Sequence, residues 1–118
     1  PVSIHSPGHI AETDEQAIEE MWPCYLESFG RLGRERGWGE TSKDHFVSEV
    51  RYGSMYVGSP ETVAAKITHA LTSVSASRFD LKYANGTMPH SKLMNTIRLY
   101  AEEVAPRVRA AVEKESAA

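Results

Sequence analysis

Two short segments in which apolar and polar residues alternate strictly lie near opposite ends of this chain. In residues 2–6, Val2 and Ile4 share one face, and residues 79–83 repeat the alternation. Such a pattern predicts half-buried β-strands. Because helix-forming sequence separates the two segments, no tight hairpin joins them, and a parallel strand–helix–strand arrangement follows. The expected fold class is therefore α/β.

The best-marked helix start lies at residues 57–64, which read VGSPETVA. Ser59 is a favourable N-cap and Pro60 suits the first helical position. Glu61 places a negative charge at the positive end of the helix dipole. Apolar residues then recur every three or four positions. We predict a helix over residues 60–74.

Three further helices are predicted, over residues 13–36, 42–50 and 88–112. Thr13 and Gln16 form a capping box for the first of them, and Pro23 inside it predicts a kink or a break. In the last helix, Thr87 or Met88 is the expected N-cap. We expect Pro106 to bend that helix near its end.

Composition bounds the class of protein. At 118 residues the chain is expected to be one domain, residues 1–118. A net charge of −3 gives no indication of binding to nucleic acid or to an anionic membrane. A single cysteine, Cys24, excludes an internal disulfide and favours a reducing, cytoplasmic location. No apolar run reaches the roughly 20 residues of a membrane span.

The polar faces of the two predicted strands leave two interpretations open. Parallel strands that are covered on both sides are usually apolar on both faces. Here Ser3 and His5, and then Asp80 and Lys82, make one face of each strand polar. The sheet is either small with one solvated face, or its polar face lines the lumen of a barrel, where active sites form.

Four motifs occur in an order that resembles the C-terminal part of the bacterial luciferase-like flavin-dependent monooxygenases. The runs are AETDEQA (11–17), VGSPETVA (57–64), GTMPH (86–90) and EEVAP (102–106). Each run alone is weak, but together they span almost the whole chain.

The resemblance implies the last two strand–helix units of a (β/α)8 TIM barrel, with residues 2–6 and 79–83 as its seventh and eighth strands. The implied parent reaction uses reduced flavin (FMN), or in one branch a deazaflavin, with oxygen to oxidise a small organic substrate. The first six strands, which carry many flavin contacts in the family, are absent. We therefore expect no flavin binding and no activity from this chain alone.

The absent strands also lead to an expectation about partners. The chain starts at Pro1 without a methionine. It is either the C-terminal portion of a longer enzyme or a shortened relative that assembles as a homo-oligomer. The alternative function, from a different class, is a non-catalytic oligomerising module derived from the barrel.

Three residues are candidates for chemistry. The resemblance places His5 where side chains face flavin or substrate, and His90 near the rim of the active site. Lys82 is expected level with His5 and offers a cation to an anionic flavin. The alternatives are a histidine bonded to a backbone carbonyl for His5, an ion pair with Asp80 or simple exposure for Lys82, and a supporting or capping role for His90.

Three other features are interpreted as structural. The helix start after Ser59 has the donors of a phosphate site, but Pro60 removes one of them, so a plain cap is favoured. His5 and His9 have no obvious third ligand, so no metal site is predicted. Cys24 lies in an aromatic segment without an adjacent base, which indicates an inert buried thiol.

Overall fold

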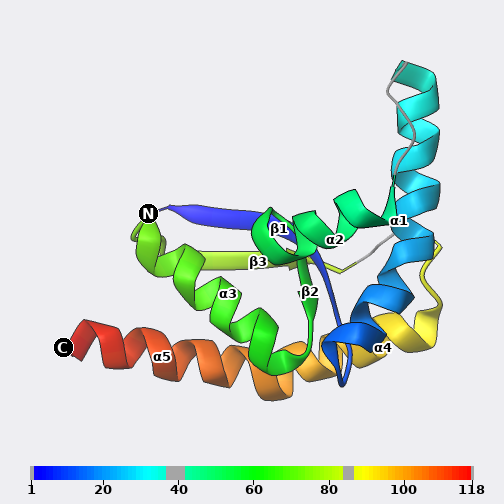
Figure 1. Ribbon diagram of the computed structural model, residues 1–118. Coiled ribbons are helices and arrows are strands. Elements are labelled where there is room, and N and C mark those ends of the chain that lie inside the picture. Colours follow the sequence, from blue (N-terminus) through cyan, green and yellow to red (C-terminus); the bar gives the residue numbers. More distant parts are fainter. Residues whose placement is uncertain (1, 37–41, 84–86, 118) are drawn as a thin grey trace.

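A small parallel sheet and a set of helices make up the part of the chain that the structure describes (Figure 1). The computed structural model describes residues 2–36, 42–83 and 87–117. The strands are β1 (Ser3–Ile10), β2 (Tyr56–Gly58) and β3 (Arg78–Lys82), and the helical elements are α1 (Asp14–Arg36), α2 (Lys43–Tyr52), α3 (Pro60–Ser73), α4 (His90–Leu99), the π-helical turn η1 (Tyr100–Val104) and α5 (Ala105–Ala117). The predicted α/β class is confirmed.

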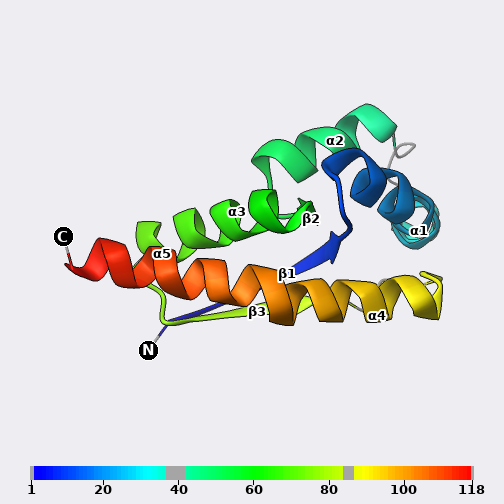
Figure 2. The same ribbon diagram turned by 90° about the horizontal axis from the view of Figure 1, so that it is seen from below.

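The sheet has helices on one of its faces. Its strand order is β2-β1-β3, and both pairings are parallel. Ile4 and Phe79 are register partners that pack with the buried side chains of α3 and η1. Figure 2 shows α1, α2 and α3 on one side of β1 and β3, and no described helix on the opposite side. Ser3 and His5 on the other face are exposed.

The strand predicted over residues 2–6 is longer than expected, because Pro7 and Gly8 do not end it. β1 is paired with β3 up to Pro7 and with β2 from Gly8 onward. Proline cannot donate to a strand ladder and is tolerated where pairing ends or changes. Pro7 occupies the position at which β1 changes partners, so its missing N–H costs little. The predicted end of this strand at residue 6 was therefore wrong.

Gly8 is required by close packing. A Cβ built on Gly8 would lie against the carbonyl oxygen of Tyr56 and 2.5 Å from Cδ1 of Leu81. We predict that Gly8→Ala lowers the free energy of unfolding by about 1–3 kcal/mol, because a backbone oxygen has little freedom to move away. Urea denaturation measures the change. Ser3→Ala, at an exposed position of the same strand, is the control, and equal stability of the two variants would contradict the prediction.

The helix starts mostly follow the predicted capping. Gln16 N–H donates to Thr13 Oγ1 at 3.1 Å, and Thr62 N–H donates to Ser59 Oγ at 3.3 Å. α1 runs through Pro23 without a break. The last helix was predicted less well. Its N-cap is Pro89, which makes no side-chain capping bond, in place of Thr87 or Met88.

The C-terminal helical segment is one continuous rod with a wide turn in it. α4, η1 and α5 follow each other without a break from residue 90 to 117, beyond the predicted end at 112, and Figure 2 shows them as one long helix beside β3. In η1 the Ala105 N–H bonds the Tyr100 carbonyl, five residues back. Pro106 follows at once. A proline ring clashes with the carbonyl four residues earlier in an α-helix, and a π-turn is one way to accommodate it.

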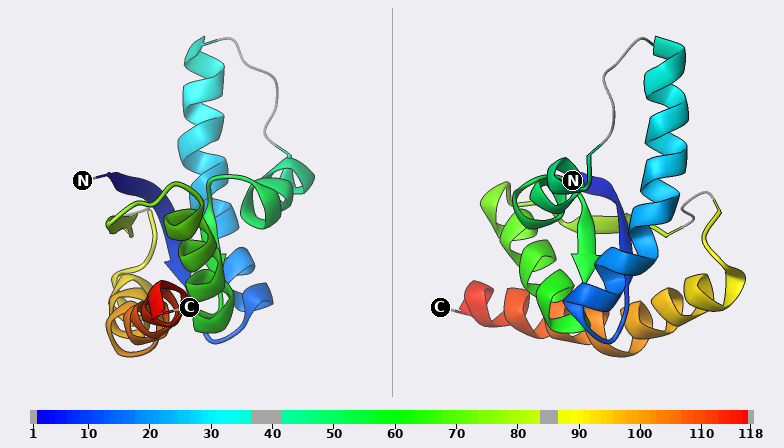
Figure 3. Two further views of the ribbon diagram at one scale, coloured as in Figure 1. Left: turned by 90° about the vertical axis from the view of Figure 1, so that its left-hand side faces the viewer. Right: turned by 45° about the vertical axis from the view of Figure 1, so that its right-hand side comes forward.

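Two apolar clusters hold the elements together. One joins α1 and α2 through Tyr25 and Phe46, whose rings lie 4.7 Å apart, and it includes the buried Cys24. The other packs α3 and η1 against the sheet through Ile10, Ile67 and other apolar residues. The far half of α1 extends away from both clusters (Figure 3). None of the described helices is long and apolar enough to cross a membrane.

Candidate functional site

His5 and Lys82, the two candidates for chemistry on the strands, lie on the face of the sheet that no described helix covers. His5 is exposed and is the register partner of Asp80, while Lys82 is exposed and is the partner of Pro7. The prediction that Lys82 lies level with His5 is therefore wrong by two residues. Asp80 occupies that level and bonds Arg78 (Nε–Oδ1 3.1 Å), not Lys82. Both candidates still project from the same face of two adjacent parallel strands.

His90 is separate from these two side chains in the contacts of the described residues. It is the exposed first residue of α4, and Gly86, which begins its motif, lies outside the described residues. Within the described ranges, no hydrogen bond or ion pair joins His90 to His5 or Lys82. The structure thus brings His5 and Lys82 onto one face, and His90 is bonded to neither among the described residues.

A third histidine, His9, forms the most enclosed polar network described. Its side chain is fully buried near the C-terminal end of β1. Nε2 lies 2.7 Å from Oε1 of Glu20 in α1, and Nδ1 lies 3.1 Å from Oγ1 of Thr96 in α4. The Thr96 hydroxyl also accepts the Ile10 N–H at 3.2 Å and lies 3.1 Å from the Ile10 carbonyl. One network therefore ties β1 to both helices.

Glu20 is held by further partners on α1 and α4. Its Oε2 accepts a hydrogen bond from the Gln16 amide at 3.0 Å and lies 3.9 Å from Nζ of Lys92. These contacts fix the carboxylate that orients the His9 ring. The network lies toward the C-terminal edge of the strands, the edge at which (β/α)8 enzymes place their active sites. His9 is fully buried and contacts side chains of both α1 and α4, so it joins β1 to these two helices.

Sequence reasoning did not assign this role to His9. It considered His9 only as a metal ligand, because the strand was expected to end at residue 6. The signal was present in the alternation, since Ser3, His5, Pro7 and His9 occupy every second position. Extending the strand through the proline would have placed His9 in it.

Burial and charge set the protonation states of the pair. Burial lowers the pKa of His9 and outweighs the opposing influence of Glu20. For Glu20, burial raises the pKa, but the hydrogen bonds from His9 and Gln16 and the charge of Lys92 more than compensate, so its pKa is lowered. The favoured pair is a neutral imidazole that donates from Nε2 to an ionised carboxylate.

These shifts predict a loss of stability in acid. A histidine whose pKa is lower when folded binds its proton more readily in the unfolded chain. Stability should therefore fall as the pH drops below 6.5, the usual pKa of histidine, with a further loss below 4.5 from Glu20. Urea denaturation across this range measures the effect. His9→Gln should flatten the slope near pH 6, whereas the exposed His45→Gln should keep it, and an unchanged slope in His9→Gln would contradict the prediction.

The start of α3 is already bonded to a carboxylate. Asp14 at the start of α1 accepts the Ser59 N–H at 2.8 Å through Oδ1 and the Thr62 hydroxyl at 3.1 Å through Oδ2. Burial raises the pKa of Asp14, but these hydrogen bonds outweigh it and lower the pKa. A negative charge therefore holds the amide that a phosphate would need. This geometry agrees with Ser59 as a plain cap.

The face that carries His5 and Lys82 is the candidate contact surface for a flavin. A ligand pocket normally surrounds most of its ligand. Two strands with exposed side chains could contact a flat ring from one side only, so the described residues do not enclose a ligand of flavin size on this face. Within the described ranges, no group of three or more His, Cys, Asp or Glu side chains could hold a metal ion.

The architecture defines a class: a helix-rich α/β segment of parallel strands with helices on one face, as in two adjacent strand–helix units of a (β/α)8 barrel. No family model matches the chain, and no curated protein matches it. Solved structures, in contrast, do match the chain. The chain is similar to the monooxygenase RslO1 from Streptomyces bottropensis, with a TM-score of 0.72 and 21% identity over 88% of this chain and 30% of that chain.

A second similar structure is a type II Baeyer-Villiger monooxygenase. It is the oxygenating constituent of 3,6-diketocamphane monooxygenase from the CAM plasmid of Pseudomonas putida, in complex with FMN. The TM-score is 0.62, with 17% identity over 90% of this chain and 33% of that chain. The chain thus spans about a third of each structure. The resemblance predicted from the motifs is confirmed at the level of the fold.

Proposed function

We propose that this chain is a segment of a luciferase-like flavin-dependent monooxygenase and forms part of the wall of its active site. The observation that carries the proposal is the polar, helix-free face of the β1–β3 pair in a fold that matches part of two monooxygenases. In a (β/α)8 barrel, polar side chains at the C-terminal ends of the strands face the active site, and the polar face of β1 and β3 fits that arrangement. The substrate class proposed is a small organic molecule.

Each candidate residue has a limited role in this proposal. When bound, reduced FMN, or a deazaflavin in the alternative branch, would supply the redox chemistry. His5 would donate or accept a hydrogen bond toward the ring or the substrate, and Lys82 would offer a cation to an anionic group. His90 is proposed at the rim. The His9–Glu20–Thr96 network would hold β1 and α4 in fixed relation beneath them. The proposed location is cytoplasmic.

The 118-residue chain alone should not bind FMN in a saturable way. The exposed face gives contacts on one side of the ring, whereas a pocket covers most of its ligand. Flavin fluorescence quenching, titrated with the purified chain, measures binding. Serum albumin at equal concentration serves as a control for non-specific quenching. Saturable binding in the micromolar range would contradict this prediction.

The length of the reading frame that encodes the chain tests the proposal itself. A (β/α)8 barrel typically needs about 250 residues, so at least about 130 residues upstream of these 118 are expected. In that complete protein, His5→Gln should lower flavin binding or turnover, and Ser3→Ala on the same face is the matched control. A complete barrel that binds neither flavin nor deazaflavin would overturn the proposal.

A second candidate function is a non-catalytic oligomerising module. One observation favours it: among the described strands, β3 pairs with β1 on one side and has no partner on the other. Unpaired strand edges are prone to pair with other chains. A start codon directly before Pro1, together with stable self-assembly, would favour this module over the enzyme segment.

A further inference from the structure

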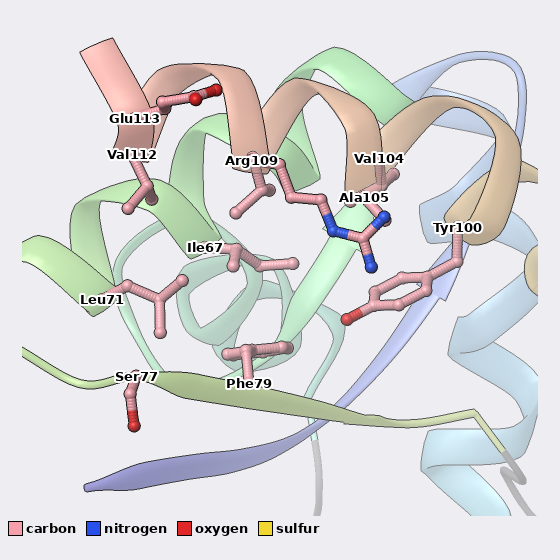
Figure 4. A pocket seen from close by; sticks show the side chains of 11 residues that line it. Ile67, Leu71, Ser77, Phe79, Tyr100, Val104, Ala105, Arg109, Val112 and Glu113 are labelled. Carbon is pink, nitrogen blue, oxygen red and sulfur yellow. The ribbon is translucent and has the colours of Figure 1, made fainter. Parts of the chain in front are cut away.

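A cleft lies between the helices and the sheet, on the opposite side of β3 from His5. Its volume is about 600 Å³, within the usual range for small-molecule sites. Figure 4 shows α3 on one side, η1 and α5 on the other, and Phe79 of β3 at the floor. Apolar side chains line most of it: Ile67, Leu71, Phe79, Val104, Val108 and Val112.

Two polar groups converge over this apolar floor. In Figure 4 the guanidinium of Arg109 and the hydroxyl of Tyr100 extend toward each other across the cleft, while the Glu113 carboxylate is directed away from Phe79. Within the described residues Arg109 makes no ion pair. Burial and the charge of Asp80 raise the pKa of Tyr100 and outweigh the opposing charge of Arg109, so the phenol is a hydrogen-bond donor at neutral pH. Both groups therefore offer donors to one anion.

The π-turn strengthens the case that the cleft is a built site. π-turns inside α-helices are rare and occur frequently at functional sites. η1 begins at Tyr100 and ends at Val104, and both side chains line the cleft. The irregular turn thus carries one of the two polar groups and part of the apolar wall.

We infer that this cleft binds a monocarboxylate with an apolar chain, such as a medium-chain fatty acid. The carboxylate would bond Arg109 and Tyr100, and the chain would lie over Phe79 between Leu71 and Val108. Guanidinium–carboxylate pairs are directional and often bidentate. One cation among the described lining residues matches a single negative charge better than a doubly charged phosphate. The site depends on no flavin chemistry and is independent of the proposed function.

Isothermal titration calorimetry with octanoate tests the inference on the intact 118-residue chain. We expect saturable binding that Arg109→Gln weakens about tenfold, the usual effect of losing one charge-assisted hydrogen bond. Arg107→Gln is the matched control, because Arg107 lies on the same helix and faces Glu103 at 3.9 Å. Its affinity should stay unchanged. 1-Octanol should bind more weakly than octanoate, because it lacks the charge.

A second variant locates the ligand. Val108→Trp should fill the cleft and abolish binding while circular dichroism shows a folded chain, and Tyr100→Phe should weaken binding without filling it. Absence of saturable octanoate binding would overturn the inference. Equal losses in Arg109→Gln and Arg107→Gln, or full affinity in Val108→Trp, would overturn it as well.

Discussion

Thr96→Val should lower the free energy of unfolding by roughly 3 kcal/mol or more. The reason is that buried polar groups of Ile10 and His9 lose the Thr96 hydroxyl at the same time. The Thr96 hydroxyl accepts the Ile10 N–H at 3.2 Å and lies 3.1 Å from both the Ile10 carbonyl and Nδ1 of His9. Valine keeps the shape but removes the acceptor of the Ile10 N–H and the single hydroxyl proton that can go to either the Ile10 carbonyl or Nδ1 of His9. Each buried polar group left unsatisfied costs about 1–3 kcal/mol. Urea denaturation at neutral pH measures the loss.

The matched control is Thr72→Val on α3. Thr72 is exposed, and its hydroxyl bonds only the carbonyls of Thr68 and His69 within its own helix. That change should alter stability by less than about 0.5 kcal/mol, as most surface substitutions do. Equal effects of the two substitutions would show that the network at His9 contributes little to stability and does not hold β1 against α1 and α4.

The second large effect concerns association: the chain alone should not sediment as a compact monomer at micromolar concentration. β3 pairs on one side only among the described strands, and the face carrying His5 and Lys82 has no described helix over it. Such edges and faces are normally covered in a folded protein. Sedimentation velocity over a dilution series should show a coefficient that rises with concentration. A compact monomer throughout would contradict this prediction.

A charge substitution tests which surface is involved. Asp80→Lys would place three cations, at positions 78, 80 and 82, along β3. Two copies that meet through this face would then repel each other, so the variant should shift toward monomer. Asp44→Lys at the exposed start of α2 makes the same charge change elsewhere and should leave association unchanged. Equal behaviour of the two variants would assign association to another surface.

The sequence by itself determined the elements that depend on local chemistry. The cap at Ser59 followed by Pro60, the capping bond from Gln16 to Thr13 and the alternation in residues 79–83 each act over a few residues, so their patterns are visible in the chain. The parallel class followed from the distance between the two alternating segments. The order of four short motifs predicted the fold, and two solved monooxygenase structures are similar to this chain.

Only the tertiary structure decided what depends on partners distant in the chain. Pro7 is tolerated because β1 changes from β3 to β2 at that residue, and the pairing register places Asp80, not Lys82, beside His5. Thr96 reaches His9 across 87 positions in the chain, a contact that no local pattern encodes. Burial then makes that imidazole neutral. Long-range pairing and desolvation are properties of the assembled fold, which is why sequence reasoning placed His5 and Lys82 on one face yet missed the network at His9.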